Sequence, residues 1–272
     1  MQTKLIKGLS QVQSKYDTFF IDLWGVIHNG VQLYEGAIDV LNNLNRLNKR
    51  FVLISNAPRP SSSVKKYLLK LKVNETFLKN IFTSGEATIQ ILKKNIYGKE
   101  FYHLGPERDK DLFIKFRENK ASLEKCDFIL CTGLFENEEG SLKYYENLLK
   151  KYTKLKMLCT NPDLIVHRGS RSEYCAGSIA ALFKKMGGKV IYIGKPYSEI
   201  YNFCIKKNES ILAIGDNIRT DIRGANNMKL DSLFIINGIH KDEFKNLPIE
   251  NYDKILWKYK TITNYYQKML NW

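Results

Sequence analysis

The stretch YDTFFIDLWGVIHNG, from Tyr16 to Gly30, decides the fold of this chain. Its apolar run 19–21 (FFI) ends in Asp22, and a turn at Gly25 follows. A short apolar run that stops at a glycine turn is typical of a buried strand in a parallel sheet. Ligands of open α/β sheets bind beyond the carboxyl ends of such strands. We therefore expect Asp22 to lie at the ligand-binding edge of a sheet.

Three later apolar runs repeat this arrangement with other polar residues at their ends. A helix at 35–49 lies between the first two runs, and strand, helix and strand within about 35 residues predict a parallel sheet. The sequence therefore predicts an α/β fold in which several polar groups meet at one edge. Run 51–54 leads to Ser55 and Asn56, run 190–194 to Lys195, and run 211–215 to Asp216 and Asp221.

A segment with a different sequence pattern separates the second of these polar groups, Ser55 and Asn56, from the third, Lys195. Its candidate strands at 101–104, 128–131 and 157–159 alternate with amphipathic helices near 110–117 and 141–152. None of these strands ends in a matching polar residue, so we expect a smaller α/β unit inserted into a Rossmann-like core. The expected ranges are 1–84 and 177–272 for the core and 85–176 for the insertion, with a closing helix in the tail 254–272.

Composition limits the cellular setting and the partners. The chain has 272 residues and a formal net charge of +15, but its lysines come as scattered doublets without a basic run of five. That pattern indicates a solvated surface and argues against nucleic acid as a partner. No run approaches the roughly 18 apolar residues of a membrane span, and the polar N-terminus lacks a secretory signal. Five cysteines without CxxC spacing indicate reduced thiols, so we expect a cytoplasmic protein without a membrane partner.

The predicted sheet edge carries the residue types needed for phosphoryl transfer. The carboxylates of Asp22, Asp216 and Asp221 would form an oxygen-rich site suited to Mg²⁺. Lys195 and Ser55 would supply a fixed positive charge and a hydrogen-bond donor for phosphoryl oxygens. A carboxylate beside the metal can attack phosphorus and form an acyl phosphate. These residues predict chemistry on a small phosphorylated metabolite, driven mainly by positioning and charge neutralisation.

The same groups resemble the four motifs of the haloacid dehalogenase superfamily. They read DLWGV at 22–26, SN at 55–56, KP at 195–196 and GDNIRTD at 215–221. The insertion resembles the type 2 cap of the NagD-like class IIA branch, as do GEAT at 85–88 and TNPD at 160–163. The resemblance spans about 16–236, and all four motifs occur in order. It implies a Mg²⁺-dependent phosphatase whose cap closes over the site, and a homodimer that forms through the cap.

The resemblance also implies a role for each matching residue. Asp22 would be the nucleophile and a metal ligand, Ser55 would hold a phosphoryl oxygen, and Lys195 would neutralise charge on both. Asp216 would bind Mg²⁺ directly, and Asp221 would bind it or orient its waters. Further expected contacts are the main-chain carbonyl of Trp24 to the metal, and Asn56, Asn161, Asp163 and Arg168 to the substrate.

Trp24 is a departure from the family pattern. Most phosphatases of the superfamily read DxDG, and the second aspartate protonates the leaving group and then activates water. An indole cannot provide this general acid–base help, which is worth about 10²–10⁴-fold. His28 is a candidate replacement, although a turn histidine with satisfied hydrogen bonds is the better interpretation.

Two alternatives follow from the residue at position 24. The first is a phosphate-binding or sensor protein of the same fold that turns over slowly. The second is a 2-haloacid dehalogenase-like hydrolase, because the superfamily's dehalogenases also carry an aromatic residue at this position. Their usual independence of metal fits poorly with the retained Asp216 and Asp221.

Overall fold

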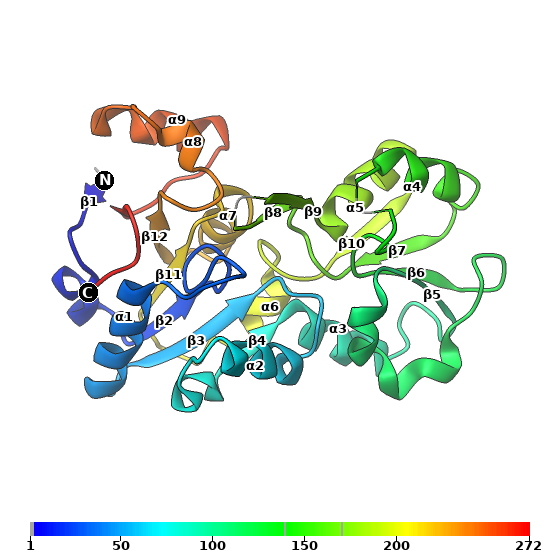
Figure 1. The fold of residues 1–272 in the computed structure, drawn as a ribbon, viewed down its shortest axis with the longest axis horizontal. Coiled ribbons are helices and arrows are strands. Elements are labelled where there is room, and N and C mark those ends of the chain that lie inside the picture. The colour runs from blue at the N-terminus through cyan, green and yellow to red at the C-terminus, as the bar shows by residue number, and fades with distance from the viewer. Residues whose placement is uncertain (1–2, 139, 170) are drawn as a thin grey trace.

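The computed structural model describes residues 3–138, 140–169 and 171–272. Residues 1–2 of the expected core, and residues 139 and 170 of the expected insertion, lie outside it. The described chain forms a seven-stranded sheet of order β1-β13-β12-β11-β2-β3-β4 and a four-stranded sheet of order β10-β7-β6-β5. Figure 1 shows the two sheets in separate lobes, the larger on the left. The predicted α/β fold with a parallel-sheet core is confirmed.

The larger sheet is doubly wound. Neighbouring residues of β2 (Thr18–Ile21) point to opposite faces, so Phe19 and Ile21 enter one apolar cluster and Phe20 enters another. Helices α1 (Glu35–Arg46) and α2 (Ser61–Lys70) cover the first face, and α6 (Ser198–Asn202) and α7 (Arg223–Asn227) cover the second. This coverage explains why β2 reads as a continuous apolar run. The other strands are β1 (Lys4–Leu5), β3 (Arg50–Ser55), β4 (Ile81–Thr83), β11 (Ile211–Gly215), β12 (Asp231–Ile235) and β13 (Tyr265–Gln267).

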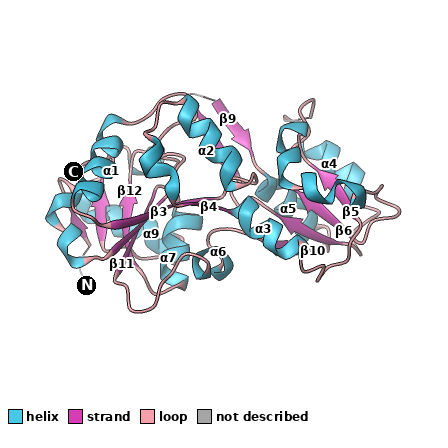
Figure 2. Cartoon of the chain, turned by 90° about the horizontal axis from the view of Figure 1, so that it is seen from below, coloured by secondary structure: helices cyan, strands magenta, loops and turns pink. Residues whose placement is uncertain are grey.

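The smaller lobe is built on a second parallel sheet. Helices α4 (Leu142–Leu149) and α5 (Ala176–Lys185) pack on one face, and α3 (Ser84–Leu92) contributes to the cluster on the other. Figures 1 and 2 both show α3 where the lobes meet. Its strands are β5 (Phe101–Leu104), β6 (Phe128–Cys131), β7 (Lys156–Cys159) and β10 (Lys189–Tyr192). The helix expected near 110–117 is instead two short 3₁₀ segments, Glu107–Leu112 and Ile114–Asn119.

The strand expected at 190–194 does not join the core sheet, and that assignment is wrong. β10 pairs with β7, with Ile191 opposite Leu158. Phe183 of α5 packs in the same apolar cluster as Met157 of β7. An apolar run shows that a segment is a buried strand, but it carries no information about which of two parallel sheets the strand joins. We propose that the insertion spans about 85–193, because α5 and β10 both pack with the smaller sheet.

The C-terminal tail is not a single closing helix. It contains α9 (Tyr252–Lys258) and then β13, which lies between β12 and β1 in the larger sheet. Tyr266 of β13 is buried edge-to-face against Phe234 and Tyr252, so alternation into an aromatic cluster outweighs helix formation. β1, near the start of the chain, and the C-terminus therefore both lie in the larger lobe (Figure 1). Among the described residues, no helix combines the length and apolar character needed to cross a bilayer.

Candidate active site

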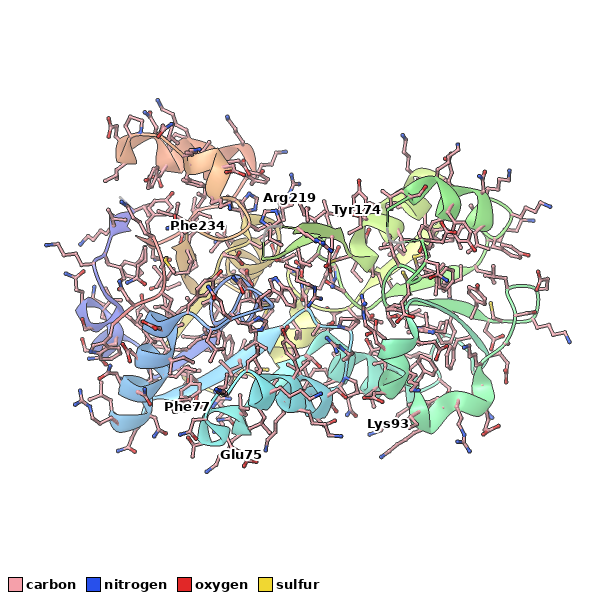
Figure 3. All side chains as sticks on the ribbon, in the orientation of Figure 1. Glu75, Phe77, Lys93, Tyr174, Arg219 and Phe234 are labelled. Atoms are coloured by element: carbon pink, nitrogen blue, oxygen red, sulfur yellow. The ribbon has the colours of Figure 1, made fainter. Side chains whose placement is uncertain are left out.

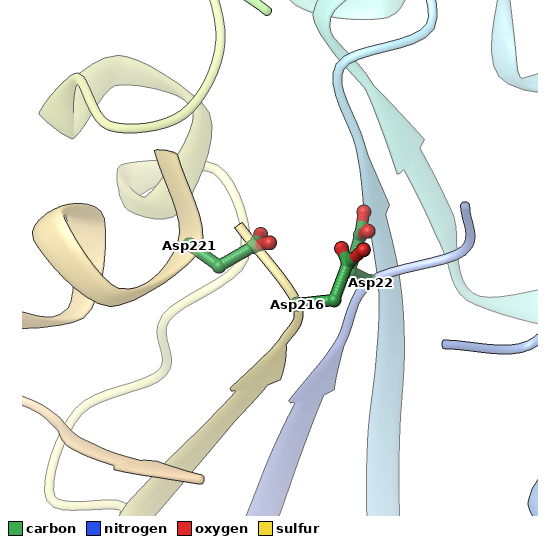
Figure 4. Close-up of side chains that lie close together, drawn as sticks. All are labelled: Asp22, Asp216 and Asp221. Carbon is green, nitrogen blue, oxygen red and sulfur yellow. The ribbon is translucent and has the colours of Figure 1, made fainter. Parts of the chain in front are cut away.

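The site lies at the carboxyl ends of three adjacent core strands. Asp22 follows β2 directly, Ser55 ends β3, and Asp216 follows β11. Figure 4 shows Asp22 and Asp216 just beyond their strands, with Asp221 on the segment that follows. Gly25 has φ of +85°, and a Cβ at this position would lie 2.1 Å from Asp216 Oδ2. The turn after β2 therefore needs glycine both for its left-handed conformation and for its close approach to Asp216.

Lys195 joins this group from the segment that follows β10. Its Nζ donates hydrogen bonds to Asp22 Oδ1 at 2.5 Å, to Asp221 Oδ1 at 2.6 Å and to the carbonyl of Ile54 at 3.2 Å. The three ionisable side chains, Lys195, Asp22 and Asp221, are each less than a tenth exposed. The structure thus brings Lys195 to the predicted edge although its strand belongs to the other sheet.

Burial and crowding perturb the ionisation of this cluster. Burial raises the pKa of Asp22 to about 8, with the ammonium of Lys195 opposing the rise. Burial and the neighbouring carboxylates raise the pKa of Asp216 well above its usual value. Burial alone would lower the pKa of Lys195, yet Asp22 and Asp221 raise it well above normal. The carboxylates therefore outnumber the cation that neutralises them, and a further positive charge would stabilise their ionised form.

The three aspartates fit a divalent cation. One ligand oxygen from each of Asp22, Asp216 and Asp221 lies within 4.8 Å of the others, and all three residues are buried. Oxygen-only donors of this kind suit Mg²⁺. Asp216 is held in place because its Oδ2 accepts a hydrogen bond from the Ile239 amide at 2.7 Å. Asp221 accepts hydrogen bonds on both oxygens, from Lys195 and from the Asn217 amide, so its position favours orienting Lys195.

Ser55 and Asn56 extend the site from the end of β3. Ser55 Oγ accepts the Ala57 amide at 3.1 Å, which leaves its hydroxyl hydrogen to donate elsewhere. Asn56 Oδ1 accepts the Lys195 amide at 2.7 Å, and Asn56 Nδ2 donates to the Lys195 carbonyl at 3.1 Å. The geometry therefore supports Asn56 as the residue that positions Lys195, and its expected substrate contact stays a prediction.

A pocket of about 580 Å³ opens above these residues, between the two lobes. This volume suits a small metabolite. The pocket is lined by the cluster, by Ser55 and by the expected substrate residues Asn56, Asn161, Asp163 and Arg168. Sequence reasoning missed further lining residues, among them Arg59, Arg108, Asp109, Thr132 and Arg171. They come from core and insertion segments that meet only in the folded chain, and no local pattern marks them.

The loop after β7 contributes Asn161 and Asp163. Asn161 Oδ1 accepts the Asp163 amide at 3.0 Å, which closes a local turn. Asp163 Oδ1 accepts a hydrogen bond from Asn217 Nδ2 at 3.2 Å, and this bond links the insertion to the loop that carries Asp216. Burial raises the pKa of Asp163 to about 6.

Arg168 and Trp24 meet at the edge of the pocket. Arg168 pairs with Glu173 at 3.0 Å, and its guanidinium carbon lies 5.0 Å from the centroid of the Trp24 ring.

His28 is 3% exposed, and its Nδ1 accepts a hydrogen bond from the Gly30 amide at 3.0 Å. Burial lowers the pKa of His28 to about 4, so it is neutral at physiological pH. These features match a turn histidine rather than a replacement acid.

Comparison with known proteins agrees with this geometry. Residues 19–116 match the haloacid dehalogenase-like hydrolase profile, and residues 192–256 match a second HAD-hydrolase-like profile. A solved haloacid dehalogenase-like hydrolase from Brucella suis 1330 is 28% identical, with a TM-score of 0.84 over 98% of this chain and 100% of the other. The chain belongs to the haloacid dehalogenase superfamily, in its NagD-like class IIA branch.

Two sequence relatives carry named activities. Ribonucleotide monophosphatase NagD of Escherichia coli (strain K12) is 29% identical over 98 residues, which is 34% of this chain. That match spans 38% of the length of NagD. Sugar-phosphatase AraL of Bacillus subtilis (strain 168) is 24% identical over 89% of this chain and 93% of its own length.

Proposed function

We propose that this protein is a Mg²⁺-dependent phosphoric monoester hydrolase for a small phosphorylated metabolite, such as a sugar or nucleotide phosphate. The observation that carries the proposal is the convergence of Asp22, Lys195 and Asp216 at the floor of a pocket of metabolite size. Family membership supports it, as do the relatives named as nucleotide and sugar phosphatases.

The proposed reaction begins at Asp22. One of its carboxylate oxygens attacks phosphorus, the bond from phosphorus to the leaving oxygen breaks, and an acyl phosphate forms on Asp22. Ser55 donates a hydrogen bond to a phosphoryl oxygen, and Lys195 neutralises charge on the carboxylate and the phosphoryl group. The departing oxygen takes a proton from solvent. Water then attacks phosphorus, the bond from phosphorus to the Asp22 oxygen breaks, and a water proton passes to solvent, which releases inorganic phosphate and restores the Asp22 carboxylate.

The proposed metal ligands are the carboxylates of Asp22 and Asp216 and the main-chain carbonyl of Trp24. When bound, Mg²⁺ supplies positive charge that offsets the negative charge of the phosphoryl oxygens. Asp221 holds Lys195 through the hydrogen bond at 2.6 Å and thereby keeps the ammonium directed at Asp22. Water exclusion would come from the insertion, which lines the pocket with residues 161, 163, 165–169 and 171–174.

Trp24 restricts the leaving groups that the proposed phosphatase can release. Its indole nitrogen donates to a main-chain carbonyl, and an indole carries no transferable proton at neutral pH. The site therefore favours leaving groups that depart without protonation. The same observation supports the second candidate, a phosphate-binding or sensor protein that turns over slowly. The buried three-aspartate cluster favours the metal-dependent phosphatase over a dehalogenase-like hydrolase.

A substrate screen tests the proposal. The full chain is assayed for phosphate release from sugar phosphates, nucleoside monophosphates, glycerol phosphate and an aryl phosphate, with Mg²⁺ or with EDTA. We expect Mg²⁺-dependent release that Asp22→Asn abolishes. The exposed Asp39 gives a matched control, since Asp39→Asn makes the same chemical change outside the site.

The outcomes separate the three candidates. No release from any compound, together with Mg²⁺-dependent binding of a phosphate analogue, would establish the binding protein instead. Halide release from a 2-haloacid without added metal would establish the dehalogenase. Cytoplasmic location and a homodimer formed through the insertion stay predictions.

A further inference from the structure

Trp24 makes two direct contacts with the β8–β9 hairpin, β8 (Ile165–Arg168) and β9 (Arg171–Tyr174), which belongs to the insertion. Its Nε1 donates a hydrogen bond to the His167 carbonyl at 2.8 Å. Its ring packs under the Arg168 guanidinium at 5.0 Å. A core residue two positions after Asp22 thus holds two consecutive residues of the hairpin.

Contacts with neighbouring core residues fix the position of the loop that carries Trp24. Tyr67 of α2 donates its hydroxyl hydrogen to the Gly30 carbonyl at 2.9 Å. The Trp24 ring lies against Gly30 so closely that a Cβ there would come within 2.5 Å of it. His28 fills the space between Trp24 and Tyr67, with ring centroids 5.1 and 5.7 Å away. The indole therefore has little freedom to move away from the hairpin.

The hairpin depends on such outside contacts for its position. Its strands form a separate two-stranded sheet, and a two-stranded hairpin is marginally stable by itself. Its residues are half-buried or exposed, so it has no core of its own. Beside the Trp24 contacts, the Gly169 amide donates to the Asn29 carbonyl at 3.1 Å. Figure 3 labels Tyr174, at the end of β9, in the region between the lobes.

The hairpin also forms one wall of the pocket. Residues 165–169 and 171–174 all line it, together with Asp22 and Lys195. A shift of the hairpin would therefore open the site to water and remove side chains from the space where a leaving group would lie. The contact between Trp24 and the hairpin is thus positioned to control access to the cluster.

We propose that Trp24 is a positioning residue that fastens the β8–β9 hairpin over the active site. Trp24 does not donate a proton to a leaving group and instead connects the core to the insertion. We call its two contacts with the hairpin the latch. Loss of both the indole N–H and the Arg168 contact raises the open fraction of the hairpin by roughly 5–50-fold, and loss of either one alone raises it by roughly 2–10-fold. The kinetic consequence rests on the proposed phosphatase function, whereas the latch itself does not.

Hydrogen exchange tests the latch without any substrate. Trp24→Phe keeps a ring but removes the N–H, and Arg168→Met keeps length but removes the cation. We expect each to speed amide exchange across 165–169 and 171–174 by roughly 2–10-fold, while exchange in β6 stays unchanged. Trp257→Phe is the matched control, because Trp257 is 62% exposed on α9. Unchanged hairpin exchange in both variants would overturn the proposal.

Kinetics supply a readout that a general loss of stability would not reproduce. In Trp24→Phe we expect KM for a phosphorylated metabolite to rise while inhibition by inorganic phosphate is unchanged, because the proposed phosphate contacts, Asp22, Ser55 and Lys195, lie outside the hairpin. A parallel loss of phosphate binding would contradict the latch. If no substrate is found, the exchange result still decides the latch, so failure of the proposed function and failure of this inference are distinguishable.

Discussion

Replacement of Lys195 by methionine is a direct test of the electrostatic design of the site. The ammonium bonds Asp22 at 2.5 Å and Asp221 at 2.6 Å, and all three side chains are nearly excluded from solvent. Lys195→Met preserves most of the side-chain volume but leaves buried carboxylates without their cation. Breaking a buried ion pair in this way typically costs ~3–5 kcal/mol. At about 2 °C per kcal/mol for a chain of this length, we expect Tm to fall by roughly 6–10 °C.

The loss of unfolding free energy caused by Lys195→Met should increase at high pH. Burial already raises the pKa of Asp22 to about 8 and that of Asp216 well above normal, and loss of Lys195 raises both further. Between the ordinary carboxyl pKa and these values the folded protein binds protons that the unfolded chain does not. Stability therefore falls as pH rises, by about 1.4 kcal/mol per pH unit for each extra proton. The wild type shares this slope up to about pH 8, so Lys195→Met should differ from it by a nearly constant amount below that pH. The difference should grow above it, where only the variant keeps Asp22 protonated.

Thermal and urea unfolding at pH 5.5 and 9, with and without Mg²⁺, measure these effects. Added Mg²⁺ should restore part of the stability lost at pH 9, because it supplies charge to the same carboxylates. Lys189→Met is the matched control at an exposed position of β10. The double variant Lys195→Met/Asp221→Asn should be less destabilised than the sum of the single changes. Wild-type stability of Lys195→Met at pH 9, or strict additivity in that cycle, would refute the reasoning.

Three further predictions follow from the site and from the insertion. Because Trp24 replaces a carboxylic acid, kcat/KM for a series of aryl phosphates should fall steeply as the pKa of the leaving group rises. In Trp24→Asp the dependence of kcat/KM on the leaving-group pKa should be weaker, and equal dependence in the two proteins would contradict this prediction. Asp216→Asn should raise the Mg²⁺ concentration for half-maximal activity by about 10-fold or more, as ligand-sphere changes typically do, and a metal titration measures it. Burial lowers the pKa of His103 to about 4 in the folded protein, whereas a histidine of the unfolded chain has a pKa of about 6.5. Between these pH values the unfolded chain is protonated at His103 and the folded protein is not. The stability that neutral His103 contributes is lost as pH falls from about 6.5 to 4, and urea unfolding should show a smaller loss for His103→Gln.

Much of the catalytic edge was predictable from the sequence. Each core strand that bears a candidate residue is a short apolar run, and the polar residue that ends it is visible in the sequence. The rule that parallel strands share a carboxyl edge then brings Asp22, Ser55 and Asp216 together before any coordinates are known. The structure places all three at that edge, as the pattern indicates.

The route by which Lys195 arrives was not predictable. Run 190–194 has the apolar character of a buried strand in either sheet, and pairing of β10 with β7 decides between them. β13 was not predicted for a related reason, since its Tyr266 is buried against Phe234 and Tyr252, which lie elsewhere in the sequence. Local periodicity reports the type of an element, whereas its partner depends on contacts across the chain.

The sequence alone determined the order of the four motifs, the parallel α/β class and the chemical types of the groups that gather at the edge. It also exposed the anomaly at position 24. Only the tertiary structure decided what Trp24 does, because the acceptor of its N–H, the His167 carbonyl, is a main-chain atom 143 residues away. Side-chain identity restricts which bonds a residue can form, but the partner that it finds is set by how distant segments pack.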